Sequence, residues 1–214
     1  APAIADVLAG KHLPKTIRIN NGRYLDSNTR SLSVWLYRTV MQTLGIPDEY
    51  KLLAEPDTCP HNRYSTSAAM FHSHLVISIL EGCSGGKLWL TRLGCWEPDS
   101  GKAYRKTLAK HAGMYRKLNE LEMIWDGPAN PFPKQPIFNF PSEVRSAFRS
   151  GFWTTGALMW MGIPSFYTKD YSGVMCLAGN DCELLSDEEL QRVLKNSVLI
   201  DGSAARALSK RGFS

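Results

Sequence analysis

The stretch Gln135 to Met161, QPIFNFPSEVRSAFRSGFWTTGALMWM, decides the predicted fold of this chain. Two prolines frame its short apolar run, and Pro141 suits the first turn of a short helix. The aromatic-rich residues from about 152 to 163 are typical of a strand. Glu143 has no histidine, cysteine or second carboxylate near it in the sequence. The chemistry of a catalytic site must therefore be sought elsewhere on the chain.

Length and composition predict an ordinary globular protein with a basic surface. The 214 residues fit one large domain or at most two small ones, and 43% hydrophobic with 21% charged residues allow a sizeable core. The net charge of +5 and the pI of about 9.0 favour a polyanionic partner, either nucleic acid or an acidic membrane face. Five irregularly spaced cysteines argue against a disulfide framework and for a reducing compartment.

The expected elements mix strands and helices without regular βαβ alternation, which favours an α+β fold. We expect a flexible segment over 1–14, then a single compact domain over 15–214, with a small antiparallel sheet packed by helices and a long Pro-rich loop. The expected strands are two short pieces in 15–26 around Asn21-Gly22, a hairpin of 74–80 with 87–93, and the segments 152–163 and 173–179. The expected helices are 29–45, 102–125, 186–198 and a short one in the tail, and 126–136 is the expected loop.

One motif matches the nucleophile elbow of hydrolases, Gly82-Cys83-Ser84-Gly85-Gly86, which fits G-x-S-x-G. That elbow needs a strand before the serine and a helix after it. A strand-like segment follows here, so a hairpin turn explains the glycines without any catalytic role.

Histidines and cysteines of metal-ligand type gather in the middle of the chain. On a strand, His72 and His74 would point to the same face and could share a metal. The spacing matches no closed zinc pattern, so we expect neither a metal nor another cofactor. A metal-dependent enzyme stays open as a weaker alternative. The cluster consists of Cys59, His61, His72, His74 and Cys83.

The strongest physical signal is the basic run KAYRKTLAKHAGMYRK over 102–117. It contains no acid, and its six positive charges exceed the net charge of the whole chain. Such a face neutralises phosphates of nucleic acid or of lipid headgroups, although most charge runs are simply solvated helix faces. Tyr104 and Tyr115 would stack on bases or lie at headgroup depth, unless they are half-buried. The six cations are Lys102, Arg105, Lys106, Lys110, Arg116 and Lys117.

The order of residues in 136–151 resembles the core of rhabdovirus matrix proteins: proline, apolar, asparagine, apolar, proline, a short arginine-containing helix and glycine. The segment also begins about 79 residues before the last residue, as it would in that family. A Ser186-Asp187 helix start leading to 197–200 and a strand followed by a helix in 16–45 agree with this. The resemblance is good over 135–201, loose over 15–45 and absent between them.

The resemblance implies a non-enzymatic matrix protein that self-associates and bridges the viral nucleocapsid to the inner face of the envelope membrane. It implies a place in the virion beneath the envelope, and in the host cytoplasm, at the inner face of the membrane and in the nucleus. The chain shows no late-domain motif for budding, and its middle is longer than the family's. An RNA-binding nucleoprotein-like or suppressor protein is the alternative.

Two surfaces follow from these expectations. The six cations of 102–117 would contact membrane, nucleocapsid or RNA. Phe132, framed by Pro131 and Pro133, would form an apolar tip that joins protomers into a homo-oligomer. The alternative is that Phe132 packs into its own domain.

Overall fold

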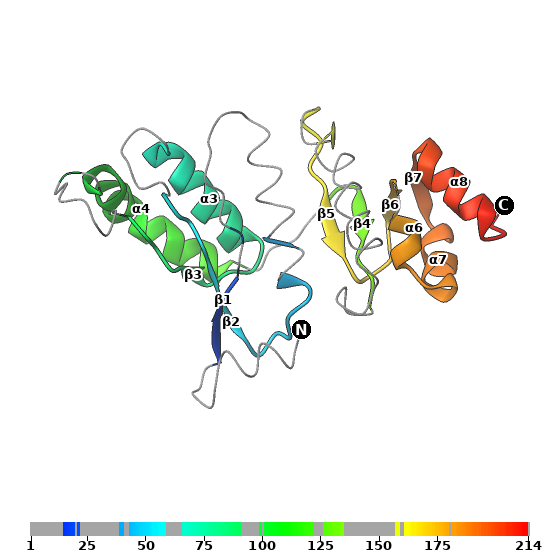
Figure 1. Cartoon of the computed structure of the whole chain (residues 1–214), viewed down its shortest axis with the longest axis horizontal. Coiled ribbons are helices and arrows are strands. Elements are labelled where there is room, and N and C mark those ends of the chain that lie inside the picture. Colours follow the sequence, from blue (N-terminus) through cyan, green and yellow to red (C-terminus); the bar gives the residue numbers. More distant parts are fainter. Residues whose placement is uncertain are drawn as a thin grey trace. The chain divides into compact units, whose positions relative to one another are not determined.

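A computed structural model gives the fold of the chain (Figure 1). The chain divides into two compact units, 1–123 and 124–214. The expectation of one domain over 15–214 stays a prediction, and the segment 1–14 lies outside the described residues. The structure describes residues 15–19, 21, 39–40, 43–58, 66–90, 99, 101–121, 126–134, 157–158, 161–179 and 181–213.

The N-terminal unit contains a parallel sheet of order β1-β2-β3. Its strands are β1 (Thr16–Arg18), β2 (Lys51–Ala54) and β3 (Gly85–Gly86). Ile17 pairs with Leu52, and Leu53 pairs with Gly85. Because all three strands run in the same direction, their carboxyl ends meet at one edge of the sheet.

Helix α3 (Ala68–Leu80) occupies the segment where a strand was expected over 74–80, so that expectation is wrong. The Ser67 side chain caps it by accepting a hydrogen bond from the Met70 amide at 3.1 Å. Phe71, Leu75 and Ile79 recur every fourth residue and are buried. A short apolar run cannot distinguish strand from helix by itself, and the capping serine was the overlooked signal.

Helix α4 (Lys102–Glu120) confirms the helix expected over 102–125 and lies beside α3 (Figure 1). The rings of Phe71 and Tyr104 lie 5.4 Å apart near the start of both helices. The Asn119 side chain donates a hydrogen bond to the Ser84 carbonyl just beyond the end of α3. The two helices are therefore parallel, and their N-termini lie at the same end of the pair.

The C-terminal unit contains a second parallel sheet, of order β5-β4-β6-β7. The expected antiparallel sheet is wrong in both units, because every strand pair that the structure describes is parallel. Parallel strands with helices between them make this an α/β-like arrangement. The elements are β4 (Ala129–Pro131), β5 (Phe166–Thr168), β6 (Val174–Leu177), α6 (Asp181–Leu184), α7 (Asp187–Leu194), β7 (Ser197–Ile200) and α8 (Gly202–Lys210).

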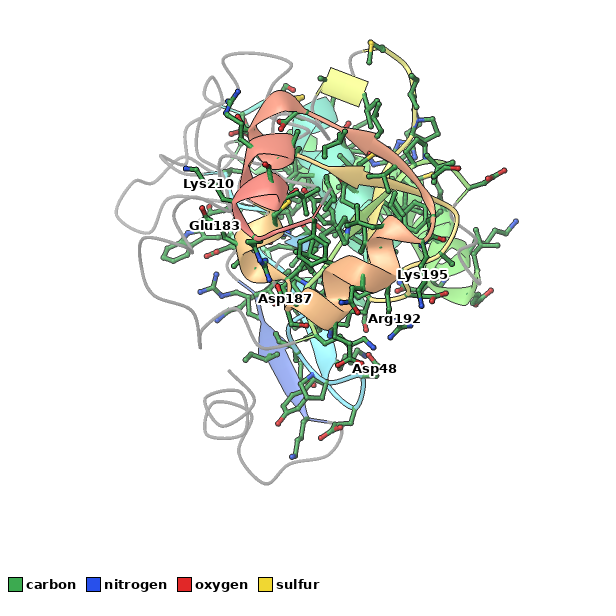
Figure 2. The ribbon with its side chains drawn as sticks, turned by 90° about the vertical axis from the view of Figure 1, so that its right-hand side faces the viewer. Asp48, Glu183, Asp187, Arg192, Lys195 and Lys210 are labelled. Carbon is green, nitrogen blue, oxygen red and sulfur yellow. The ribbon has the colours of Figure 1, made fainter. Side chains whose placement is uncertain are left out.

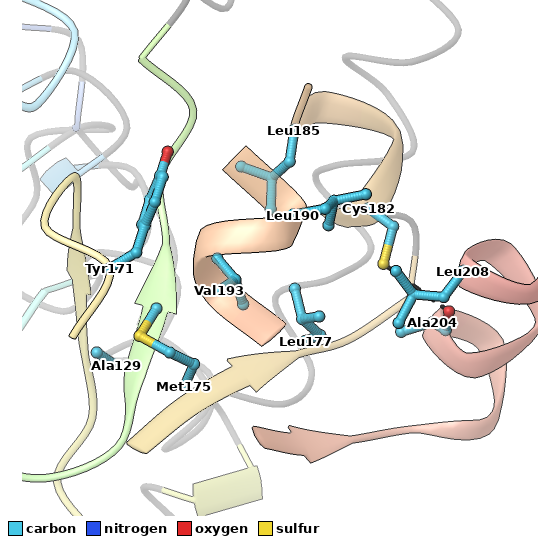
Figure 3. Packing of buried hydrophobic residues seen from close by; sticks show 10 residues of the cluster. All are labelled: Ala129, Tyr171, Met175, Leu177, Cys182, Leu185, Leu190, Val193, Ala204 and Leu208. Atoms are coloured by element: carbon cyan, nitrogen blue, oxygen red, sulfur yellow. Dashed lines mark hydrogen bonds between the residues drawn. The ribbon is translucent and has the colours of Figure 1, made fainter. Parts of the chain in front are cut away.

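Helix α7 confirms the predicted capping box: Ser186 accepts from the Glu189 amide, and the Glu189 side chain accepts from the Ser186 amide. Its apolar face joins β6 and α8 in the main cluster of this unit (Figure 3). The charged side chains labelled on α6, α7 and α8 in Figure 2 are exposed. The buried cluster is Ala129, Tyr171, Met175, Leu177, Cys182, Leu185, Leu190, Val193, Ala204 and Leu208.

Other expectations are decided in part. The strand 173–179 and the tail helix are confirmed by β6 and α8. The loop 126–136 contains strand β4. Of the strand expected over 152–163, Ala157 and Leu158 are helical, and most of the rest lies outside the described residues. Most of the helix expected over 29–45 and most of the segment 135–161 also lie outside the described residues.

Candidate functional site

The six predicted cations form one exposed face of α4, here called the basic face. At 3.6 residues per turn they lie within about 140° of the helix circumference, over about 22 Å of its length. Their side chains are exposed. Lys102 forms an exposed ion pair with Asp99 at 3.7 Å, which is worth little in water. The basic face consists of Lys102, Arg105, Lys106, Lys110, Arg116 and Lys117.

The opposite face of α4 packs on α3 and takes up both predicted tyrosines. Tyr104 is buried, and its hydroxyl donates to the Thr66 carbonyl at 2.6 Å. The Tyr115 hydroxyl lies 2.7 Å from Nδ1 of His72. Tyr104 is thus buried and Tyr115 is half-buried, so the expectation that they stack on bases or lie at headgroup depth is wrong. The basic face therefore presents charge without an aromatic platform from Tyr104 or Tyr115.

The described members of the His/Cys cluster, which the sequence left as a weaker metal-site alternative, do not form a metal site. His72 and His74 lie on helix α3 rather than on a strand, and two positions along a helix point to opposite sides. The His72 ring stacks on His111 at 4.2 Å, whereas His74 is buried and burial lowers its pKa to about 4. Burial raises the pKa of the Cys83 thiol to about 12. The described residues contain no group of three metal-ligating side chains, while Cys59 and His61 lie outside them.

The G-x-S-x-G segment follows helix α3 and ends in strand β3, the reverse of a nucleophile elbow. Ser84 donates its amide to the Leu52 carbonyl at 2.8 Å. The segment therefore connects α3 to the sheet, although not as the hairpin turn expected from the sequence.

The expected apolar tip at Phe132 is wrong. Phe132 is 1% exposed, and Pro131 and Pro133 are buried. Its amide donates to Thr168 at 2.7 Å, and its carbonyl lies 2.8 Å from the Tyr171 hydroxyl. Pairing beside β5 directs the side chain inward, which is the alternative that the sequence left open.

Sequence reasoning missed a pocket at the carboxyl edge of the N-terminal sheet, here called the carboxyl-edge pocket. In parallel α/β sheets, ligands bind outside the carboxyl ends of the strands. Arg18 ends β1, Glu55 follows β2 and Lys87 follows β3. A bridge between Asp57 and Trp89 extends the pairing past the strands. The pocket has a volume of about 180 Å³ and is lined by Arg18, Glu55, Asp57, Lys87, Leu88 and Trp89.

Glu55 is held rigidly in this pocket. Its amide donates to Oδ1 of Asn21 at 2.8 Å, and its Oε1 pairs with Arg18. Asn21 is fully buried and donates in turn to Thr39 at 2.8 Å and Ser78 at 3.0 Å. Oε2 of Glu55 is buried and has no hydrogen-bond partner within the described part of the chain. A fixed carboxylate with accepting capacity left is a typical ligand contact.

The comparisons place no constraint on the function. No protein-family model, curated protein or solved structure matches the chain. Across the described residues, no helix is both long and apolar enough to cross a membrane.

Proposed function

We propose that the N-terminal unit binds a neutral, polyhydroxylated small molecule of the carbohydrate class in the carboxyl-edge pocket. The observation that carries the proposal is Glu55 at the carboxyl edge of three parallel strands. One oxygen of its carboxylate pairs with Arg18, the other is buried without a partner among the described residues, and its backbone amide is held by Asn21. Ligands of parallel α/β sheets bind outside the carboxyl ends of the strands, and this pocket lies at that position.

The composition of the pocket selects the ligand class. Two carboxylates accept hydrogen bonds, and Arg18 and Lys87 donate them, so the formal charges of the lining cancel. A neutral ligand with many hydroxyls matches such a lining better than an anion or a cation. Trp89 is 45% exposed and offers an aromatic face to the C–H side of a sugar ring.

The test is calorimetric titration with neutral mono- and oligosaccharides, with tryptophan fluorescence as a second readout. Trp89→Ala and Glu55→Gln should each weaken binding about tenfold or more. Glu49→Gln changes an exposed acid before β2 and serves as the control. Binding that is unaffected by both pocket variants, or no binding at millimolar sugar, would contradict the proposal.

A second function, polyanion binding, is favoured by the basic face of α4. Six cations on one helix face suit a phosphate backbone or an anionic membrane. This is the part of the assembly-protein hypothesis that the described residues support, because a matrix-like protein would contact nucleocapsid and lipid through such a face. The apolar side of α4 packs on α3, so lipid contact would be electrostatic rather than insertion.

Co-flotation with anionic and neutral vesicles, repeated with excess single-stranded RNA, tests this second function. Flotation only with anionic vesicles, together with self-association, supports the membrane form. Tight, salt-sensitive RNA binding without flotation supports the nucleic-acid form. If neither result is obtained, the basic face is only a solvated helix face.

A further inference from the structure

A second pocket lies where the N-termini of α3 and α4 meet, here called the helix-start pocket. Its volume is about 470 Å³, within the roughly 300–1,000 Å³ typical of small-molecule sites. Thr66, Ser67 and Ala68 line it from the start of α3. Lys102, Ala103 and Lys106 line it from the first turns of α4. The two pockets have no lining residue in common.

Two parallel helices direct their N-termini at this pocket. The positive ends of both helix dipoles therefore favour an anion there. By their position in the first turn, the amides of Ala68 and Ala103 have no carbonyl partner within their own helix. The N-cap of α4 is Gly101, which supplies no side-chain cap. The hydrogen bond from Tyr104 to the Thr66 carbonyl fixes the two helix starts together.

Thr66 provides an independent observation that points to a ligand. It is 4% exposed, and its Oγ1 has no hydrogen-bond partner among the residues that the structure describes. Burying a hydroxyl without a hydrogen-bond partner is unfavourable. Thr66 belongs to the pocket lining, which places this unsatisfied hydroxyl next to the volume that a bound oxyanion would occupy.

The charges around the pocket favour a phosphate over a carboxylate. Lys102 and Lys106 supply two ammonium groups, and Asp99 offsets one of them through its pair with Lys102. A phosphate presents oxygens in several directions, so it can accept from both helix starts, from a lysine and from a hydroxyl at once. A carboxylate has only two oxygens in one plane.

We propose that the helix-start pocket binds a phosphate group, carried by inorganic phosphate or by a phosphate monoester. The site does not depend on the carboxyl-edge pocket. It shares Lys102 and Lys106 with the basic face, whereas Arg116 and Lys117 lie at the far end of α4.

The experiment is calorimetric titration of the full chain with inorganic phosphate and with methyl phosphate at constant ionic strength, against chloride. Thr66→Val and Lys106→Ala should each weaken binding about tenfold. Asp99→Asn should tighten it several-fold, because Lys102 loses its competing partner. Tighter binding of methyl phosphate indicates an ester ligand, and the reverse indicates the free ion.

The double variant Arg116→Ala/Lys117→Ala separates this site from the polyanion function. It should weaken RNA or vesicle binding and leave phosphate affinity unchanged. Thr66→Val removes a hydroxyl without a described partner, so its melting temperature should not fall, and Lys106→Ala changes an exposed side chain. No heat of phosphate binding, or equal affinity in wild type, Thr66→Val and Lys106→Ala, would overturn the proposal.

Discussion

The Tyr171 hydroxyl donates a hydrogen bond of 2.8 Å to Oε1 of Glu189, the same carboxylate that closes the capping box of α7. Oε1 also accepts from the Lys134 amide at 2.8 Å, and Oε2 accepts from the Ser186 amide at 2.8 Å. One carboxylate thereby joins the segment after β5, the segment after β4 and the start of α7.

Glu189→Gln should destabilise the protein by about 2 kcal/mol, because an amide cannot accept from all of these donors. Burial alone would raise the pKa of Glu189, but the hydrogen bonds from Ser186, Lys134 and Tyr171 lower it below its ordinary value. The stabilisation is therefore present above the unfolded pKa and is lost as pH falls through the folded one. Urea unfolding at pH 7 and pH 4 measures both effects. Glu188→Gln, exposed in the same turn, should change stability little.

Asp181, at the start of α6, should make stability depend on pH in the opposite direction. Burial raises its pKa to about 8, and the charge of Asp201 adds to this, against a hydrogen bond from Ala178. A raised folded pKa means stability that is full below the unfolded pKa and lost as pH rises toward 8. Asp181→Asn should flatten this dependence and stabilise the protein at pH 8. Glu183→Gln, exposed on the same helix, should leave the slope unchanged in thermal melts between pH 4 and pH 9.

Two glycines should respond oppositely to alanine. A Cβ at Gly127 would lie 2.5 Å from the Pro164 carbonyl oxygen, and φ is +143°. Gly127→Ala should cost about 2 kcal/mol or more. Gly113 lies inside α4 with no atom of the described residues near its Cβ position. Gly113→Ala should stabilise by about 0.5–1 kcal/mol. Equal shifts in the melting temperature would contradict this account of Gly127.

Asn21 should be essential to the N-terminal unit. Asn21→Ala removes the hydrogen bonds that the Asn21 side chain makes with the Glu55 amide, Thr39 and Ser78, which should cost about 3 kcal/mol or more. It should also lower sugar affinity under conditions where the protein is still folded, because Glu55 loses its anchor. Asn119→Ala removes an exposed amide that bonds the Ser84 and Tyr115 carbonyls, and as the matched control it should cost much less. An Asn21→Ala protein that unfolds at the same urea concentration as wild type would contradict this role.

Features that depend on residues close together in the sequence could be predicted, and features that depend on distant residues could not. The capping box of α7 and the cationic face of α4 depend on residues within a few positions of each other, and both are present. Apolar residues in 74–80 recur at both a two-residue and a four-residue spacing, so the pattern fits a strand as well as a helix. The sequence therefore predicts a strand where α3 is found. Its Ser67 cap would have identified it.

The parallel sheets and the carboxyl-edge pocket depend on distant residues and could not be predicted in this way. β1 pairs with β2 across a long intervening segment, and nothing in either strand specifies direction. A strand in place of α3 removes the β-α-β order from the predicted elements. Adjacent strands joined by a short turn then predict an antiparallel hairpin. Arg18, Glu55 and Trp89 then have no reason to be grouped.

The basic face makes a quantitative prediction about salt. If all six cations contact single-stranded RNA, log affinity should fall against log salt with a slope of about −4. Reversing Arg105, Lys106 and Lys110 to glutamate should reduce the magnitude of that slope to about 2 or less and weaken binding strongly at moderate salt. The three side chains are exposed, so the fold should survive, as circular dichroism would verify. Reversal of the exposed lysines Lys51, Lys195 and Lys210, outside α4, is the charge-matched control. A slope that changes equally in both triple variants would mean that only net charge matters and that α4 is not the contact surface.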